Sequence, residues 1–220
     1  MKVRILWSGI TGRTGIQAKI AAEECEYAEV VAGISRSNRD YYNYDELSKI
    51  QEQFDVIVDF SHKDSFDKIL TFAIKVRKPL IIGTAALAEY QRKNIEQASH
   101  VIPIFGGGNF MFGVEKFITE IINLAKTKDE IKIVERHYKT KKIPSDTAKA
   151  IVRRVKQETG KETTIESFLE YDDEINDWQV GELRHVVKNA RQIIGHDILK
   201  IAKLMTKQKP GLYYLEDLLK

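Results

Sequence analysis

The chain has 220 residues, of which 43% are hydrophobic and 30% charged; this balance is typical of a globular protein and excludes disordered or collagen-like chains. A formal net charge of +3 at pH 7 gives no electrostatic argument for binding nucleic acid or a membrane surface. The opening segment MKVRILWSGI is interrupted by glycine too early for a signal peptide. The single cysteine, Cys25, excludes an internal disulfide and favours a reducing compartment, so we expect a cytoplasmic protein without a membrane partner.

Short apolar runs alternate with helical segments over the first half of the chain. The pattern predicts strands at Val3–Trp7, Glu29–Ile34, Phe54–Phe60, Pro79–Gly83 and Val101–Phe105. It predicts helices between them at Gln17–Glu26, Ser65–Val76 and Leu87–Ala98. Strand–helix alternation at this spacing is typical of an α/β fold with a Rossmann-type parallel sheet and helical crossovers.

The order of the elements changes after three consecutive glycines at Gly106–Gly108. Beyond them the pattern predicts helices at Val114–Ala125, Ser145–Gln157 and Arg191–Met205. It predicts alternating strands at Glu130–Tyr138, Thr163–Tyr171 and Trp178–Lys188, followed by the tail KPGLYYLEDLLK. The loss of the strand–helix alternation places a domain hinge near residues 106–109 and predicts a second, smaller α+β domain.

Three glycines lie between the first strand and the first helix, at Gly9, Gly12 and Gly15. At such a turn, glycines let a diphosphate approach the backbone and sit on the helix N-terminus. The spacing is G-x-x-G-x-x-G, because Ile10 stands where the dinucleotide fingerprint has its second glycine. The segment predicts a nucleotide-binding turn; the alternative is an ordinary junction between a strand and a helix.

The second strand ends in Ile34-Ser35-Arg36-Ser37, with no carboxylate at its tip. An NAD-selective site carries Asp or Glu here to bond the ribose 2′-hydroxyl. Hydroxyls and a guanidinium instead suit a 2′-phosphate, because arginine forms charge-assisted hydrogen bonds with anions. We therefore expect NADPH as the cofactor, with NADH as the alternative; the structural alternative is a solvated loop.

The segment ERHYKTKKIPSDTA at residues 135–148 combines three features of an anion-binding catalytic corner. Strand alternation places Glu135 and His137 on one face, with His137 at the strand's end, where a side chain can face a cleft. Its imidazole can exchange a proton near neutral pH, and Lys141 adds a cation four residues later. Pro144 and Ser145 begin a helix whose first N–H groups attract anions, with Ser145 as a good N-cap. The combination suits a small dicarboxylate; the alternative is a surface loop with a partly buried histidine.

Six short motifs, in order along the chain, resemble those of the 4-hydroxy-tetrahydrodipicolinate reductases (dihydrodipicolinate reductases) of bacterial lysine and diaminopimelate biosynthesis. With the family pattern after each, they are Gly12–Gly15 (G-R-M-G), Asp59–Ser61 (D-F-[ST]), Gly83–Ala86 (G-T-T-G), Gly108–Val114 (A-N-F-S-x-G-V), Glu135–Ala148 (E-x-H-H-x-x-K-x-D-A-P-S-G-T-A) and Lys209–Tyr213 (K-x-G-L-Y). The resemblance covers nearly the whole chain.

The resemblance implies an oxidoreductase that reduces 4-hydroxy-tetrahydrodipicolinate to tetrahydrodipicolinate with NAD(P)H. It implies a dinucleotide-binding domain over residues 1–108 plus about 190–220, to which the C-terminal helix returns. Residues 109–189 would form a domain for substrate binding and oligomerisation. Four sheets of this second domain would join in a homotetramer.

By the same resemblance, His137 and Lys141 are the catalytic acid and its cationic partner, which complete the reduction after hydride arrives from the nicotinamide. Cofactor contacts are expected from the glycine turn, the second strand's tip and three later loops: Gly9, Thr11, Gly12, Arg13, Thr14, Gly15, Ser35, Arg36, Phe60, Gly83, Thr84, Gly108, Asn109 and Phe110. Substrate contacts are expected from Tyr138, Lys141, Ser145, Asp146 and Thr147. The other histidines form no cluster at ligand spacing, so we expect no metal site.

The chain departs from the family pattern around the expected site. Asp146 replaces a glycine and would repel a substrate carboxylate unless its side chain turns to solvent. Tyr138 replaces the second histidine, and the loop from Lys141 to Pro144 is one residue shorter. Ala85 and Ala86 replace a threonine and a glycine. Two alternatives follow: a diverged dehydrogenase of the same fold that acts on another imine or amine, and an NADPH-sensing module without catalysis.

Overall fold

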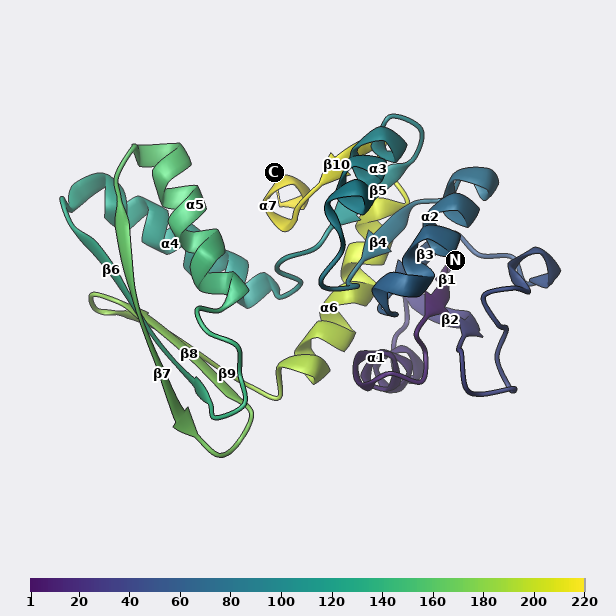
Figure 1. Ribbon diagram of the computed structural model, residues 1–220, viewed down its shortest axis with the longest axis horizontal. Coiled ribbons are helices and arrows are strands. Elements are labelled where there is room, and N and C mark those ends of the chain that lie inside the picture. Colours follow the sequence, from purple (N-terminus) through teal and green to yellow (C-terminus); the bar gives the residue numbers. More distant parts are fainter. Residues whose placement is uncertain (220) are drawn as a thin grey trace. The chain divides into compact units, whose positions relative to one another are not determined.

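The computed structural model describes residues 1–219, which form two compact units (Figure 1). The first unit comprises residues 1–110 together with the C-terminal residues from Ile194 onward. The second unit comprises Met111–Ile193. The boundaries expected from the sequence, at 108 and about 190, lie close to these positions. None of the helices in the described part of the chain is both long and apolar enough to cross a membrane.

The first unit is built on a six-stranded sheet with the order β10-β5-β4-β3-β1-β2, in which all neighbouring strands are parallel. The strands are β1 (Val3–Ser8), β2 (Ala28–Ile34), β3 (Val56–Asp59), β4 (Leu80–Ile82), β5 (Pro103–Gly106) and β10 (Gly211–Tyr213). The helices are α1 (Arg13–Glu23), α2 (Lys63–Val76), α3 (Glu89–Ser99) and α7 (Leu215–Leu218), with a 3-10 turn at Leu47–Lys49; α6 (Ala190–Met205) begins in the second unit and belongs to the first from Ile194 onward. This sheet confirms the predicted α/β fold of the Rossmann type.

The central strands of this sheet are buried on both faces, and for this reason their sequences are continuous apolar runs. Every residue of β3 and of β4 is buried. One face packs against α2 and α3: Leu6, Ile57 and Ile104 share a core cluster with Phe66 of α2 and Ile95 of α3. Because β1 lies between β2 and β3, the strand order reverses beside β1. In open α/β sheets, ligands bind at the carboxyl ends of the strands next to such a reversal.

The C-terminal segment completes the first unit. A Cβ at Gly195 would lie 2.9 Å from the carbonyl carbon of Gln17 and 3.0 Å from the nitrogen of Ala18, so α6 crosses α1 with the two backbones in contact. The tail, for which the sequence pattern predicted no element, forms β10 beside β5 and the short helix α7. Three residues are too few to show a periodic pattern, and β10 is defined by its pairing with β5.

The second unit is a four-stranded sheet with the order β7-β6-β8-β9. Its strands are β6 (Ile131–Tyr138), β7 (Thr163–Tyr171), β8 (Ile175–Val180) and β9 (Leu183–Lys188), and its helices are α4 (Phe112–Thr127) and α5 (Asp146–Thr159). β6 pairs in parallel with β7 and antiparallel with β8, and β8 pairs antiparallel with β9. The mixed sheet with two helices confirms a smaller α+β unit.

The prediction of one continuous strand over Trp178–Lys188 was wrong. This segment is a hairpin in which β8 ends at Val180 and β9 begins at Leu183. Gly181 takes a φ of +58°, which the first position of a two-residue hairpin turn requires and which glycine adopts without strain. The apolar positions are Trp178 and Val180 before the turn and Leu183 after it, so the alternation shifts by one residue at the turn.

The strand β6 alternates as predicted. Ile131, Ile133, Glu135 and His137 are buried on one face, and the residues between them are exposed or half-buried on the other. The polar pair Glu135 and His137 therefore belongs to the interior of the second unit.

Candidate active site

The glycine turn of the first unit has the geometry that the sequence predicted. Gly9 takes a φ of +79°, and a Cβ there would lie 2.3 Å from the carbonyl oxygen of Phe60. A Cβ at Gly15 would lie 2.5 Å from the carbonyl oxygen of Ile10. Gly12 is the N-cap of α1, and no described side chain caps this helix. The first N–H groups of α1 therefore remain available to an anion such as a diphosphate.

Ser35 at the tip of β2 is buried and engaged within its own loop. Its hydroxyl lies 3.0 Å from the hydroxyl of Thr11 and accepts hydrogen bonds from the backbone N–H groups of Ser37 and Asn38. Arg36 is exposed and forms no hydrogen bond or ion pair with any residue that the structure describes. Of the two residues expected at the ribose, Ser35 shapes the loop and Arg36 is free to meet a ligand.

A buried carboxylate lies at the carboxyl end of β3. The Thr84 hydroxyl donates to Asp59 Oδ2 at 2.7 Å, and the backbone N–H of Ser61 donates to the Thr84 hydroxyl at 3.0 Å. Burial raises the pKa of Asp59, and the hydrogen bonds it accepts, led by that from Ser8, lower it only in part. The pattern D-F-S contained Asp59, but we expected no role for it, because a sequence does not show how many donors a buried carboxylate has.

Aromatic rings surround the loops after β3, β4 and β5. The ring of Phe60 stacks on Trp7 with the centroids 5.7 Å apart and covers Gly83, where a Cβ would lie 2.2 Å from its Cζ. Phe110 packs against Phe60 with the centroids 5.1 Å apart. A Cβ at Gly108 would meet nothing within 4 Å, so the backbone of this loop is open on that side. The predicted residues Phe60, Gly83 and Phe110 are thus brought together at the reversal of strand order.

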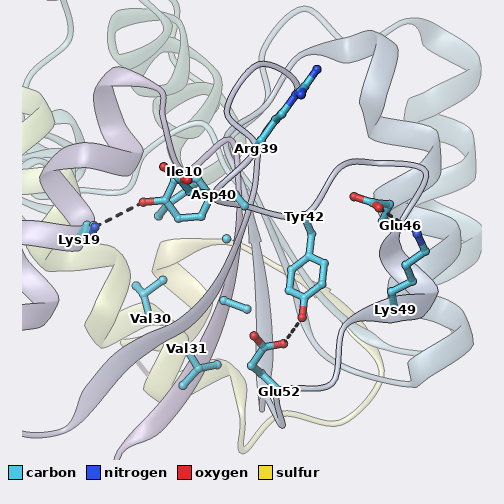
Figure 2. Close-up of a pocket in the computed structure, with 13 residues that line it drawn as sticks. Ile10, Lys19, Val30, Val31, Arg39, Asp40, Tyr42, Glu46, Lys49 and Glu52 are labelled. Carbon is cyan, nitrogen blue, oxygen red and sulfur yellow. Dashed lines mark hydrogen bonds and ion pairs between the residues drawn. The ribbon is translucent and has the colours of Figure 1, made fainter.

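A cavity of about 490 Å³ lies elsewhere in the first unit, beside the edge strand β2 (Figure 2). Its walls come from α1, from β2 and from residues 39–52, and they carry charges of both signs, including Lys19, Arg39 and Glu52. The Tyr42 hydroxyl donates to Glu52 at 2.8 Å. None of the residues expected to bind the cofactor lines this cavity.

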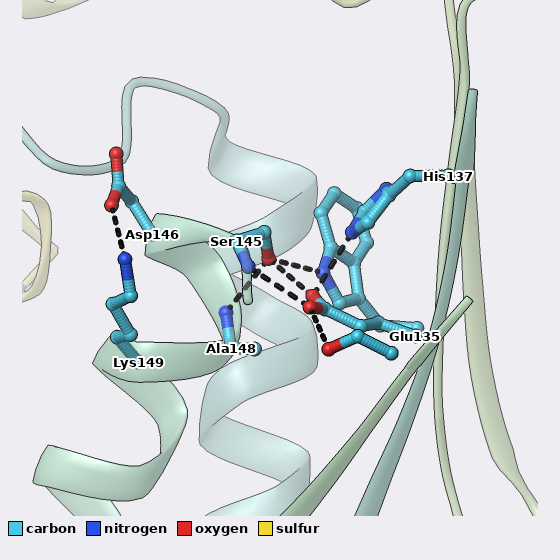
Figure 3. A network of polar contacts seen from close by, with 8 residues as sticks. Glu135, His137, Ser145, Asp146, Ala148 and Lys149 are labelled. Carbon is cyan, nitrogen blue, oxygen red and sulfur yellow. Dashed lines mark hydrogen bonds and ion pairs between the residues drawn. The ribbon is translucent and has the colours of Figure 1, made fainter. Parts of the chain in front are cut away.

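In the second unit, two polar residues of the expected catalytic corner, His137 and Ser145, contact one carboxylate, that of Glu135 (Figure 3). Glu135 is fully buried. Its Oε1 accepts from the backbone N–H of Ser145 at 2.9 Å and from the Ser167 hydroxyl at 2.6 Å. Its Oε2 accepts from the Ser145 hydroxyl at 2.5 Å and lies 2.9 Å from His137 Nε2. Burial raises the pKa of Glu135, but the bonds from His137, Ser145 and Ser167 outweigh it and lower the pKa to about 2.

His137 is fully buried, whereas we expected it where a side chain can face a cleft. Its ring meets Trp178 edge to face with the centroids 5.4 Å apart. While Nε2 is engaged with Glu135, Nδ1 has no hydrogen-bond partner among residues 1–219. His137 therefore lies in the interior of the second unit, on the buried face of β6 that also carries Ile131 and Ile133.

Ser145 is the N-cap of α5, as predicted, and accepts a hydrogen bond from the N–H of Ala148 at 3.1 Å. Its hydroxyl also accepts from Trp178 Nε1 at 3.1 Å while donating to Glu135. A hydroxyl has one donor and two acceptor positions, so all three are used inside the protein. The first N–H groups of α5 that remain available to a ligand are those of Asp146 and Thr147.

The carboxylate of Asp146 turns away from this network. Its side chain is 87% exposed and forms an ion pair with Lys149, one turn along the helix, at 3.4 Å (Figure 3). The repulsion that this residue would exert on a bound carboxylate is therefore weakened by solvent and by a neighbouring cation. The replacement of glycine by aspartate is compatible with an anion at the first turn of α5.

Lys141 lies in a tight turn at the end of β6. Its backbone N–H donates to the carbonyl oxygen of Tyr138 at 2.9 Å, and its ammonium lies 5.7 Å from the centroid of the Tyr138 ring. Lys141 forms no ion pair with any described residue, and its side chain is half-buried. The shortened loop thus keeps an unpaired cation close to the strand end that carries His137. Within residues 1–219, no group of three or more His, Cys, Asp or Glu residues is placed to hold a metal ion.

Three residues of this network were not among the expected site residues: Glu135, Ser167 and Trp178. Glu135 lies two residues before His137 in the pattern E-x-H, and its place on the same strand face could have indicated that the two side chains are neighbours. Ser167 and Trp178 gave no signal, because they come from strands that reach Glu135 and Ser145 only through the pairing of β6 with β7 and β8.

Comparison with known proteins identifies relatives along the whole chain. A family model described as the N-terminus of dihydrodipicolinate reductase matches residues 3–110. A 4-hydroxy-tetrahydrodipicolinate reductase of Caldanaerobacter subterraneus subsp. tengcongensis is 32% identical over 250 residues, which cover 100% of this chain and 99% of the relative. A reductase of the same name from Alkaliphilus oremlandii is 27% identical and covers 98% of each chain. The dipicolinate-bound dihydrodipicolinate reductase of Paenisporosarcina sp. TG-14 has the same fold, with a TM-score of 0.76 at 16% identity over 97% of this chain and 98% of that one.

The parallel sheet with its glycine turn and the reductases among the relatives define the class: this protein is an oxidoreductase that uses a nicotinamide cofactor. Within that class, the chain belongs to the 4-hydroxy-tetrahydrodipicolinate reductase family.

Proposed function

We propose that the protein reduces 4-hydroxy-tetrahydrodipicolinate to tetrahydrodipicolinate, with loss of water, using NADPH in the cytoplasm as part of lysine and diaminopimelate biosynthesis. The observation that carries this proposal is the 32% identity to a reductase of this name over both units of the chain. The N-capped anion site of α5 and the Glu135–His137 pair support it, because a dicarboxylate needs a site for its charge and the reduction needs a proton.

The cofactor fits the glycine turn, where the backbone approaches so closely that no Cβ can stand at Gly9 or Gly15. We propose that the first turn of α1 holds the diphosphate and that Arg36 meets the 2′-phosphate of NADPH. The cofactor supplies hydride; the protein's own part at this end is to bind and orient it. Arg36→Ala should therefore raise KM for NADPH by at least tenfold while leaving KM for NADH nearly unchanged. An equal rise for both cofactors would contradict the assignment.

At the substrate end, we propose that the N–H groups of Asp146 and Thr147 hold one carboxylate and that the Lys141 ammonium balances its charge. His137 is the proposed proton carrier. Lys141→Met should raise KM for the substrate and lower kcat, whereas Asp146→Gly should change either constant by no more than threefold, because the Asp146 side chain already faces solvent. Loss of activity in Asp146→Gly would instead indicate a direct contact of this carboxylate with the ligand.

We further propose that the open face of the second unit's sheet forms a homotetramer. This face carries Phe168 and Val186, which are 42% and 45% exposed. On the same face Asp177 is fully buried and held by a two-bond pair with Arg184 and by the Tyr171 hydroxyl. Light scattering should give four times the chain mass, and Val186→Glu should reduce it. A monomer in the unaltered protein at micromolar concentration would end this part of the proposal.

The decisive assay generates the substrate with a synthase and follows the loss of NADPH absorbance. Turnover that pyridine-2,6-dicarboxylate inhibits is the expected result. Protein that binds NADPH but turns over no substrate would favour a diverged dehydrogenase for another imine or amine. If His137→Ala and Lys141→Ala changed no measurable rate, a non-catalytic NADPH-sensing module would be favoured instead.

A further inference from the structure

The carboxylate of Glu135 accepts on both oxygens, and this settles the direction of every hydrogen bond around it. The Ser145 N–H can only donate. The Ser145 hydroxyl accepts from the Ala148 N–H and from Trp178 Nε1, so its own hydrogen must point to Glu135. With Ser167 as a third donor, three of the about four acceptor positions of Glu135 are filled, and these bonds help to lower its pKa to about 2, so the carboxyl group carries no proton of its own.

The same argument assigns the hydrogen on His137. A carboxylate without a proton is an acceptor only, so the 2.9 Å contact between Glu135 Oε2 and His137 Nε2 requires the hydrogen on Nε2. In the neutral imidazole, Nδ1 is then the basic atom. Nδ1 is buried and has no partner among the described residues. Asn176 lies directly opposite His137 on β8, and its buried Oδ1 also lacks a partner, so both side chains offer unpartnered acceptor atoms.

We propose that Glu135 is a positioning residue of this reductase: it holds His137 as the Nε2–H tautomer, so that the proton of the reaction enters and leaves at Nδ1. The same carboxylate also accepts a hydrogen bond from Ser145, the N-cap of α5. These two contacts fix the position of the imidazole relative to the first turn of α5, where the carboxylate of the substrate is proposed to bind. This inference rests on the proposed function for its kinetic part, whereas the tautomer is a property of the protein without any ligand.

The first test needs no substrate. Histidine labelled with ¹⁵N in both ring nitrogens, observed by long-range proton–nitrogen correlation, reports which nitrogen carries hydrogen, and His137→Gln identifies the signal. We expect the neutral imidazole of His137 to show hydrogen on Nε2 and none on Nδ1. Hydrogen on Nδ1 would overturn the proposal.

The second test compares two variants that alter the same carboxylate. Glu135→Gln keeps the shape but introduces an amide NH₂ that donates, so the tautomer should invert and kcat should fall about 10²-fold with the affinity for NADPH unchanged. Ser167→Ala is the matched control, because it removes one donor but leaves the bonds of Glu135 to His137 and Ser145. It should keep the tautomer and keep kcat within threefold. Equal losses of kcat in the two variants, or an unchanged kcat in Glu135→Gln, would contradict a positioning role.

The outcomes separate this inference from the proposed function. If the unaltered protein turns over no substrate, the proposed function fails, while the tautomer result still decides the geometry. If Glu135→Gln does not fold, the ¹⁵N measurement on the unaltered protein together with the kinetics of Ser167→Ala remains decisive: a loss of kcat above tenfold with the tautomer kept would overturn the positioning role.

Discussion

Asp59 in the first unit and Glu135 in the second are both fully buried carboxylates, yet their pKa values move in opposite directions. Burial raises the pKa of each. At Asp59 burial prevails over the hydrogen bonds that lower the pKa, which come from Ser8, Thr84 and Ser61. Glu135 accepts on both oxygens from His137, Ser145 and Ser167, so its pKa falls to about 2. Two carboxyl groups with no exposed surface can therefore differ in pKa, because burial outweighs the hydrogen bonds at Asp59 and the hydrogen bonds outweigh burial at Glu135.

The difference suits the proposed role of Glu135. An ionised Glu135 can hold a histidine hydrogen and a helix N-terminus by charge-assisted bonds. The carboxyl group of Asp59, in contrast, is held by the Thr84 hydroxyl at the carboxyl end of β3, and burial raises its pKa.

The largest expected effect is the loss of stability in Glu135→Gln. The new amide places its own donors against those of His137 and the two serines, which should lower the free energy of unfolding by about 3 kcal/mol. Urea unfolding followed by Trp178 fluorescence, with Trp7→Phe as the common background, reports on the second unit. A loss below about 1 kcal/mol would mean that the carboxylate charge matters little.

The second effect is the pH dependence that Glu135 creates. Its pKa is about 2 in the folded protein and 4.5 in the unfolded reference, so its stabilisation is present above pH 4.5 and is lost as the pH falls towards 2. The full difference corresponds to about 3 kcal/mol. Urea titrations between pH 6 and 3 should show a steeper loss in the unaltered protein than in Glu135→Gln. Parallel curves would contradict the lowered pKa.

The third prediction concerns single donors. Thr84→Val removes the hydroxyl that donates to Asp59 and leaves the Ser61 N–H without its acceptor, which should destabilise the first unit by about 1–2 kcal/mol. Ser167→Ala, which removes one of several donors to Glu135, should cost the second unit about 1 kcal/mol or less. Unfolding curves for the two variants, each read with its own unit's tryptophan, test the order of these effects.

The smallest effect is expected for Asp59→Asn. Because the folded pKa of Asp59 is raised, its stabilising contribution is greatest below the unfolded value of 3.8 and is lost as the pH rises through the folded value. The amide cannot ionise, so the variant should be within about 1 kcal/mol of the unaltered protein at pH 7 and relatively less stable at pH 3. Trp7 fluorescence in a Trp178→Phe background provides the measurement. A strong loss of stability at pH 7 alone would show that Asp59 is ionised and needed as an anion.

Local pattern was sufficient for the elements that are long or continuously apolar. The strands β1 to β5 and the helices between them follow from apolar runs and helical periods, and the alternation of β6 correctly placed Glu135 and His137 on one face. The N-cap at Ser145 was also predictable, because the hydroxyl and its N–H partner on Ala148 lie within one turn of the chain.

Contacts between segments that are distant along the chain could not be predicted from the local sequence pattern. The hydroxyl of Ser35 lies 3.0 Å from that of Thr11, which is 24 residues away in the chain, and the sequence did not indicate this pair. The side chain of Asp146 faces solvent and Lys149, a direction that the sequence position alone left open.

The α/β class, the glycine turn and the expected catalytic corner could be predicted from the sequence, because each depends on residues near one another along the chain. That Glu135 lies at the centre of this polar network follows from the tertiary structure alone. Its partners Ser145 and Ser167 lie 10 and 32 residues away, and they reach one carboxylate only after strands pair and α5 packs on the sheet. A buried charge is stable where enough donors converge on it, and convergence is a property of the fold.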